Sequence, residues 1–236
     1  MKNISIKDLL DAGIHFGHKT NRWNPKMSEF IFGQRNGIHI IDLQKTITLL
    51  NEALTAVKEF SADGKNILFI GTKRQASDLI EKYAKDCNQY FINKRWLGGM
   101  LTNWDTIQNS IKKLKDMEDI LENKINSYTK KEILNFSNSV EKLNKALGGI
   151  KNMVGKPDLL FIIDTNKEIL AVKEANKIGI PIVAVVDSNS NPQGIDYPIP
   201  GNDDAIRSIE FYCNAVCETI TNNHRKIEED KTRQKK

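Results

Sequence analysis

Residues 93–104, Asn-Lys-Arg-Trp-Leu-Gly-Gly-Met-Leu-Thr-Asn-Trp, combine chemical groups that an ordinary core strand or surface loop seldom needs. Lys94 and Arg95 can neutralise phosphates, and the rings of Trp96 and Trp104 offer flat faces for a base, a sugar or a guanidinium. The adjacent glycines let the backbone turn sharply or approach a partner closely. Taken alone, the segment fits a nucleic-acid contact or, equally, a tight turn whose tryptophans only anchor the next helix.

A second set of basic and aromatic side chains lies before the first long helix, in a segment over residues 14–26 that is predicted to be irregular. Cations suit phosphates, and flat rings suit the unpaired bases of a folded RNA. The tryptophans are expected either to stack on bases or to anchor their loops. The full set of predicted RNA-binding residues is His15, His18, Lys19, Arg22, Trp23, Asn24, Lys26, Arg35, Lys73, Arg74, Lys94, Arg95, Trp96, Asn103 and Trp104.

A nucleotide-binding enzyme is the main alternative. The apolar run that ends at Gly71-Thr72 leads into a helix, and an anion could bind at that helix N-terminus. However, the chain has neither a G-x-G-x-x-G fingerprint nor a P-loop. Lys73 and Arg74 could equally be solvated residues of the first helical turn. We therefore predict no small-molecule substrate and no cofactor.

Metal binding and acid-base catalysis also lack a supporting motif. His15 and His18 resemble a metal pair only loosely, because no third ligand of suitable spacing follows. No nucleophile or carboxylate is tied to them by a motif. Asp164, Asp187 and Asp203-Asp204, at predicted strand ends or a helix start, could be general acids, but capping is the simpler explanation. We therefore predict no metal site and no catalytic residue.

Composition narrows the class of protein only a little. The 236 residues contain 35 Lys and Arg against 30 Asp and Glu, so the net charge of +5 permits a nucleic-acid partner without requiring one. Three cysteines are too few for a disulfide framework and agree with a reducing compartment. No secretory signal or membrane-spanning apolar segment is evident, so we expect a soluble, intracellular protein that contacts no membrane.

Apolar strands alternate with helices along most of the chain. This alternation predicts an α/β fold, with a parallel sheet covered by helices on both faces. Prolines in the last strand place it at an edge. A short capped helix and an Asn-Gly hairpin precede this alternation. The predicted helices are 5–12, 43–60, 73–86, 166–178 and one from about 203 past 219, and the predicted strands are 30–32, 38–41, 66–72, 90–92, 157–164, 181–187 and 197–200.

The alternation is interrupted at residues 102–150, where apolar residues recur at spacings of three and four between charged faces. This pattern predicts an inserted antiparallel helical hairpin that turns near 126–129 and rejoins the body at a Gly148-Gly149 hinge; two ordinary layer helices are the alternative. The predicted body comprises residues 1–101 and 151–223. Residues 224–236 are charged without apolar periodicity, which predicts a fraying helix end or a disordered tail.

Taken in order, a series of motifs resembles the family of the bacterial small-subunit ribosomal protein S-two (S2), over most of the chain. The motifs are Ala-Gly-Ile-His-Phe-Gly-His at 12–18, Trp-Asn-Pro-Lys-Met at 23–27, Phe-Ile-Phe-Gly at 30–33, Gly-Thr-Lys-Arg at 71–74, Arg-Trp-Leu-Gly-Gly-Met-Leu-Thr-Asn-Trp at 95–104, Leu-Gly-Gly-Ile-Lys at 147–151, Ile-Pro at 180–181, Val-Asp-Ser-Asn at 186–189 and Ile-Pro-Gly-Asn-Asp-Asp-Ala at 199–205.

The resemblance implies a flavodoxin-like or Rossmann-like body with an inserted coiled-coil hairpin. It implies a structural, non-catalytic role in the small subunit of the cytoplasmic ribosome. The expected partners are small-subunit ribosomal RNA, between head and body on the solvent side, and neighbouring ribosomal proteins. Among these is the multi-OB-fold protein S-one (S1), which captures messenger RNA and which the family helps recruit. Family members often end in an acidic tail, whereas this chain ends in a basic one, so no tail function is carried over.

Two further classes stay open beside this expectation. One is a sugar-phosphate or nucleotide enzyme on the same fold, which a phosphate-dependent thermal shift with turnover would favour. The other is a protein-interaction scaffold that uses the helical hairpin, which RNA-independent capture of a partner would favour. Salt-sensitive binding of RNA would favour the ribosomal role over both.

Overall fold

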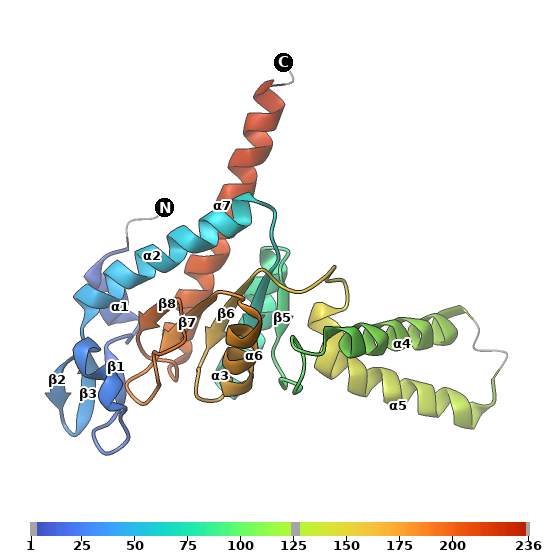
Figure 1. Ribbon diagram of the computed structural model, residues 1–236, viewed down its shortest axis with the longest axis horizontal. Helices are drawn as coiled ribbons and strands as arrows, with labels where there is room; N and C mark the ends of the chain where they lie inside the picture. Colours follow the sequence, from blue (N-terminus) through green and yellow to red (C-terminus); the bar gives the residue numbers. More distant parts are fainter. Residues whose placement is uncertain (1–3, 124–127, 235–236) are drawn as a thin grey trace.

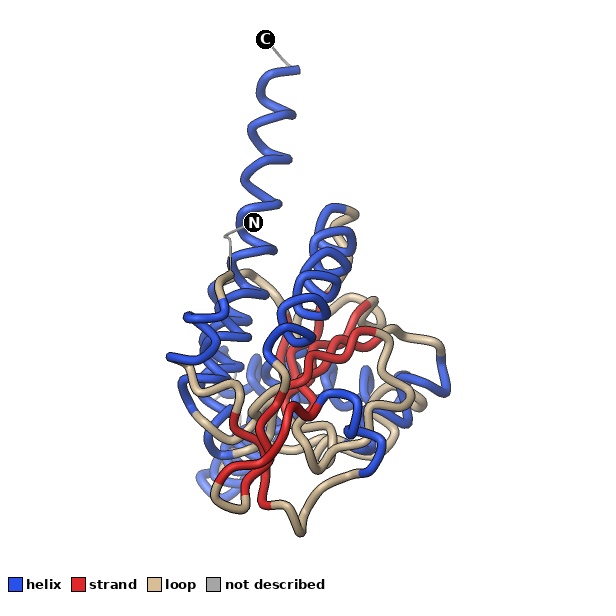
Figure 2. The backbone as a smooth tube through the Cα atoms, turned by 90° about the vertical axis from the view of Figure 1, so that its left-hand side faces the viewer, coloured by secondary structure: helices blue, strands red, loops and turns tan. Residues whose placement is uncertain are grey.

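The computed structural model describes residues 4–123 and 128–234, with side chains as far as residue 225. Its centre is a sheet with helices around it (Figures 1 and 2). The strands of this sheet are parallel and have the order β5-β4-β6-β7-β8. In chain order this is second, first, third, fourth, fifth, the order of flavodoxin-like sheets, so the predicted fold class is confirmed. The proline-containing strand lies at an edge, as predicted. The strands are β4 (Ile67–Ile70), β5 (Tyr90–Ile92), β6 (Leu159–Ile163), β7 (Ile182–Val186) and β8 (Tyr197–Pro200).

The central strands are continuous apolar runs because both of their faces are covered. Every residue of β4, β6 and β7 is buried. Side chains alternate between faces, so Phe69 and Phe161 enter one core while Leu68 and Leu160 enter the other. The two phenylalanine rings meet edge to face with centroids 5.2 Å apart.

Each core is closed by a different set of elements. Four helices pack on one face: α1 (Ile6–Asp11), α2 (Leu43–Ala62), α3 (Arg74–Asp86) and α7 (Ile206–Gln234). On the other face lie α6 (Ile169–Ile178), residues 96–101 and a 3-10 turn, η3 (Gly148–Ile150). Among the described helices, none has both the length and the apolar content of a membrane span.

Local signals in the sequence set several element ends. Ser5 and Asp8 form the capping box that begins α1. Asp42 accepts a hydrogen bond from the Gln44 backbone and so caps α2. Gly179 ends α6 with a φ of 75°, in the left-handed region that glycine adopts without strain.

A small antiparallel sheet, in the order β1-β3-β2, lies at the end of the molecule opposite α4 and α5 (Figure 1). The predicted Asn36-Gly37 turn is confirmed, since both residues have positive φ. The prediction of an irregular segment over 14–26 is wrong in part, because it contains β1 and the start of the 3-10 helix η1. The half-exposed β1 pairs with β3 through its backbone and therefore leaves no apolar alternation in the sequence. The elements are β1 (Phe16–Lys19), η1 (Pro25–Phe30), β2 (Ile31–Arg35) and β3 (Ile38–Ile41).

Two helices, α4 (Trp104–Asn123) and α5 (Lys130–Leu147), lie side by side and project from the body (Figure 1). The predicted turn falls partly outside the described residues, at 126 and 127, while Thr129 caps α5 through a capping box with Glu132. The division into a body and an inserted coiled-coil arm over 102–150 stays a prediction.

The structure adds detail at Gly149 and in the tail, while the hinge at Gly148-Gly149 stays a prediction. Gly149 packs so closely on β5 that a Cβ atom there would collide with the Phe91 carbonyl oxygen, so close packing requires the glycine. The tail from residue 224 was expected to be a fraying helix end or a disordered extension; α7 continues through Gln234, which agrees with a helix end. Lys, Glu, Arg and Gln have good helix propensity, and an existing helix extends without a new nucleation step.

Candidate functional site

Parallel strands end at a common edge, and four strand ends here carry ionisable side chains. Lys73 follows β4, Asp164 follows β6, Asp187 follows β7, and the pair Asp203-Asp204 follows β8. His18 reaches the same place from β1. We call His18, Lys73, Asp164, Asp187, Asp203 and Asp204 the carboxyl-edge cluster.

Lys73 is the cation at the centre of this cluster. Its Nζ lies 3.3 Å from Asp164, 2.8 Å from Asp203 and 2.5 Å from Asp204. Burial alone would lower the pKa of Lys73, but the charges and hydrogen bonds of these carboxylates outweigh burial and raise it. The side chain is only 15% exposed. Lys73 therefore has internal partners in place of the phosphate that the sequence predicts.

Asp203 is the most buried carboxylate of the three that Lys73 contacts, with 2% of its side chain exposed. Burial, together with the charges of Asp187 and Asp164, raises its pKa to about 7, although Lys73 opposes the shift. The four aspartates of the cluster, when ionised, carry more negative charge than the single ammonium of Lys73 neutralises.

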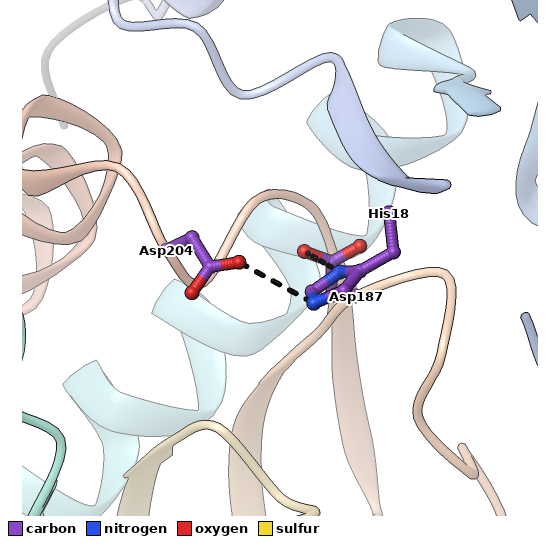
Figure 3. Close-up of side chains that lie close together, drawn as sticks. All are labelled: His18, Asp187 and Asp204. Carbon is purple, nitrogen blue, oxygen red and sulfur yellow. Dashed lines mark ion pairs between the residues drawn. The ribbon is translucent and has the colours of Figure 1, made fainter. Parts of the chain in front are cut away.

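His18 ties the small sheet to this edge (Figure 3). Its Nδ1 lies 3.1 Å from Asp187 and its Nε2 lies 3.3 Å from Asp204, while its backbone N–H donates to Ser188 Oγ at 2.8 Å. The hydrogen bond to Asp187 raises the pKa of His18, burial opposes it, and the charges of Asp187 and Asp204 add to the rise. With a carboxylate at each ring nitrogen, the imidazolium form is favoured. The predicted RNA contact through His18 therefore competes with two internal carboxylates.

The imidazole and carboxylate atoms of His18, Asp187 and Asp204 all lie within 4.8 Å of one another, so these donors could hold a divalent cation. No third ligand for a His15–His18 pair is evident in the sequence, since the carboxylates are distant in the chain. His15 does not join them. The ammonium of Lys73 already contacts Asp204, and it would compete with a metal ion for that carboxylate.

The crevice between β4 and β6 is the switch point at which doubly wound enzymes bind ligands. Here the chain's own side chains occupy it. Thr72 donates to Glu168 Oε1 from its backbone N–H at 2.9 Å and from its hydroxyl at 2.5 Å. Lys167 Nζ donates to the Thr72 carbonyl oxygen at 3.0 Å. Polar groups that would meet a nucleotide are thus paired with each other.

The 93–103 loop, the segment before α4, is organised around one carboxylate. Glu174 on α6 accepts hydrogen bonds from the backbone N–H groups of Gly99, Leu101 and Thr102, from the Thr102 hydroxyl and from the Trp96 indole, at 2.8–3.1 Å. Partial burial alone would raise the pKa of Glu174, but these hydrogen bonds outweigh burial and lower it. Glu174 therefore binds this loop as an ionised carboxylate.

Both tryptophans of this region are core residues. Trp96 and Trp104 are each 6% exposed and pack in the same core as Met100 and Leu101. Lys94 and Arg95, by contrast, are exposed, and Lys94 Nζ donates to Ser77 Oγ at 3.1 Å. The structure thus favours anchoring over base stacking for the two indoles and leaves the two cations at the surface.

The remaining predicted residues are mostly at the surface. Trp23 is 41% exposed, with its ring 5.2 Å from that of His39. Asn24 caps η1, His15 is half-buried, and Asn103 accepts a hydrogen bond from Thr106. The exposed predicted cations are Lys19, Arg22, Lys26, Arg35, Arg74, Lys94 and Arg95.

Glu174 was not predicted as a site residue, and capping was preferred to acid catalysis as the role of Asp187 and Asp204. Glu174 lies on a helix that otherwise resembles an ordinary half-exposed one, and no local motif marks it. The aspartates after strands offered a usable signal, because parallel strands bring their carboxyl ends together. That signal places carboxylates near Lys73, but it does not identify His18 as their partner.

Comparison with known proteins gives a consistent result. The family model described as "Ribosomal protein S2" matches residues 9–223. "Small ribosomal subunit protein uS2" of Acidiphilium cryptum is 58% identical over 220 residues, 93% of this chain and 86% of that protein. The proteins of the same name from Parvibaculum lavamentivorans and Paramagnetospirillum magneticum are 55% and 58% identical, over 93% and 92% of this chain and 87% and 82% of their own length.

Proposed function

The chain belongs to the ribosomal protein S2 family, and from this premise we propose that it binds small-subunit ribosomal RNA through exposed cations of its N-terminal segment and of the 93–103 loop. It is a structural constituent of the small ribosomal subunit that acts in translation, and it is not an enzyme. It is located in the ribosome, in the cytoplasm.

One observation carries the RNA-binding proposal. Seven predicted cations are exposed, and in the described part of the chain none of them forms an ion pair: Lys19, Arg22, Lys26, Arg35, Arg74, Lys94 and Arg95. Lysine and arginine without an internal counter-ion are the groups that neutralise phosphates and release condensed counterions. Lys73 is left out of the proposal, because its ammonium contacts three carboxylates.

Binding of the full chain to in vitro transcribed small-subunit ribosomal RNA, measured over a series of KCl concentrations, tests this proposal. Arg22→Ala and Arg95→Ala should each lower the slope of log affinity against log salt by about 1. Lys58→Ala removes an exposed cation from α2, outside both groups, and serves as the control. Unchanged slopes for both arginine variants would refute the assignment of these surfaces to RNA.

We also propose that the small sheet contacts a neighbouring ribosomal protein, S1 being the partner that the family resemblance suggests. Phe32 is 80% exposed on β2 and Phe16 is 47% exposed on β1. Phe16 pairs with Ile40, which is itself only half-buried. Exposed aromatic side chains in one sheet, beside a half-buried isoleucine, are typical of a protein-binding surface.

A binding assay with purified S1 tests this second surface. The double variant Phe16→Ser/Phe32→Ser should weaken S1 binding while leaving the affinity for ribosomal RNA unchanged. Leu134→Ser, which changes a 60% exposed residue on α5, is the matched control. Wild-type S1 affinity in the double variant would exclude the small sheet as the contact.

A further inference from the structure

We propose that Glu174 is a positioning residue for RNA binding, holding the 93–103 loop so that Lys94 and Arg95 are fixed at the surface before RNA arrives. The inference rests on the proposed function and deepens it. The carboxylate of Glu174 already accepts five hydrogen bonds from the loop, so it would act on RNA through the cations and not by direct contact. Its role would be to organise the loop in the free protein.

The loop surrounds Glu174 as a concave anion site surrounds its anion. Three backbone N–H groups, one hydroxyl and one indole N–H converge on its two carboxylate oxygens. Oε1 accepts from Trp96 and Gly99, while Oε2 accepts from Leu101 and from both donors of Thr102. Backbone N–H groups gathered in this way bind anions strongly. The carboxylate therefore fixes the course of the chain from residue 96 to residue 102.

Lys94 and Arg95 lie between two fixed points. On one side is Asn93, 6% exposed, whose Nδ2 donates to the Ser77 carbonyl oxygen at 3.2 Å and to Glu81 Oε2 at 2.8 Å. On the other side is Trp96, buried and bonded to Glu174 at 3.1 Å. A two-residue span held at both ends loses little further backbone freedom on binding, and such pre-organisation raises affinity.

Net charge alone predicts that removal of this carboxylate strengthens RNA binding, whereas loss of positioning predicts that it weakens binding. Glu174→Gln makes the chain more positive by one unit, which should strengthen binding to a polyanion. If positioning dominates, the same substitution should weaken binding, because an amide cannot accept all five hydrogen bonds and aims N–H donors at other donors. The sign of the change in affinity therefore separates the two explanations. Glu52→Gln on the exposed face of α2 makes the same charge change and is the matched control.

The experiment measures the affinity of the full chain for in vitro transcribed small-subunit ribosomal RNA in a double-mutant cycle. We expect Glu174→Gln to bind about tenfold more weakly than wild type and Glu52→Gln to bind at least as tightly. Lys94→Ala/Arg95→Ala should weaken binding and lower the salt slope by about 1.5. Adding Glu174→Gln to that double variant should cause no further loss, because the cations that it positions are gone.

Several outcomes would overturn the inference, and they differ from a failure of the proposed function. Wild-type affinity in Glu174→Gln, or a full additional loss in the triple variant, would refute positioning while RNA binding itself stands. Absence of salt-dependent RNA binding in wild type would refute the proposed function and the inference with it.

A measurement on the wild-type protein covers the case in which Glu174→Gln does not fold. Hydrogen exchange in the free chain should show protected amides at Gly99, Leu101 and Thr102, the three backbone donors to Glu174. Exchange as fast as in an exposed loop would overturn the inference, since the loop would then lack order before RNA binds.

Discussion

Two regions of this molecule pair cations with carboxylates in opposite ways. In the carboxyl-edge cluster, the ammonium of Lys73 contacts Asp164, Asp203 and Asp204, and its charge is used inside the protein. In the 93–103 loop, the internal carboxylate of Glu174 binds backbone and indole donors, and the cations Lys94 and Arg95 stay at the surface. The first arrangement holds the fold together, and the second leaves positive charge for a partner.

The difference shows that a basic residue next to a glycine-containing turn is not by itself a phosphate contact. Lys73 and Arg74 are neighbours in one Gly-Thr-Lys-Arg segment, yet one ammonium is 15% exposed among carboxylates and the other side chain is exposed. Which of the two neighbours meets a carboxylate depends on strands that end far away in the chain. Mutations at the two regions should therefore separate stability from RNA binding.

The largest effect is expected at Lys73. Lys73→Met should lower the free energy of unfolding by about 3 kcal/mol, because it leaves the buried Asp203 carboxylate without its counter-ion. Urea denaturation measures the change. Arg74→Met on the same turn is the control and should stay within about 0.5 kcal/mol of wild type. An equal loss of unfolding free energy in both variants would show that the ion pairs of Lys73 do not distinguish it from the exposed Arg74.

The two buried tryptophans offer a sharper comparison within the loop region. Trp96→Phe removes the indole donor to Glu174, whereas the Trp104 indole N–H has no hydrogen-bond partner within the described residues. Both variants shorten a buried side chain. Trp96→Phe should therefore cost about 1–2 kcal/mol more than Trp104→Phe, the difference reflecting a hydrogen bond to a charged acceptor. Thermal or urea unfolding of the pair measures it, and equal costs would show that Glu174 gains little from the indole.

The pH dependence of stability tests the His18 contact. The folded-state pKa of His18 is raised, mainly by Asp187 and Asp204. Its stabilising contribution is therefore fully present below the unfolded pKa of about 6.5 and is lost as pH rises through the folded pKa. Raising the pH from about 6 to about 8 should reduce the stability difference between wild type and His18→Gln, by about 1 kcal/mol or less because the site is partly screened by solvent.

Asp203 titrates in the same direction, since a carboxylate whose pKa is raised to about 7 also favours the folded state at lower pH. The wild-type curve alone therefore does not isolate His18, and the difference from His18→Gln is the quantity to follow. If this difference does not change between pH 6 and pH 8, then the contacts with Asp187 and Asp204 do not raise the pKa of His18 in the folded state.

Much of the fold follows from local patterns. A strand with an apolar residue at every position, such as Ile182–Val186, must be covered on both faces. This requirement predicts a parallel sheet with helices on both sides. Asn36-Gly37 adopts positive φ at a hairpin turn, as its residue types predict. β1 was missed because it is held by backbone pairing with β3 and by contacts of His18 with Asp187, Ser188 and Asp204, which lie far away in the chain.

The candidate site was less predictable for the same physical reason. Exposed cations such as Arg22 and Arg95 can be proposed from residue type alone, because a long basic side chain reaches solvent unless something holds it. Whether a carboxylate holds it depends on contacts between distant segments, as between His18 and Asp187 or between Trp96 and Glu174. Those partners have ordinary local contexts, so composition and spacing do not mark them.

The smallest effect on stability is expected at Arg95. Arg95→Ala should change the free energy of unfolding by no more than about 0.5 kcal/mol, because the side chain is exposed and, within the described residues, forms no ion pair. Urea denaturation under the conditions used for Lys73→Met measures it. A loss above about 2 kcal/mol would reveal an internal role for Arg95, and the loop would then resemble the carboxyl-edge cluster. A small loss combined with a reduced salt slope for RNA would instead mark Arg95 as a cation that stabilises the complex and not the fold.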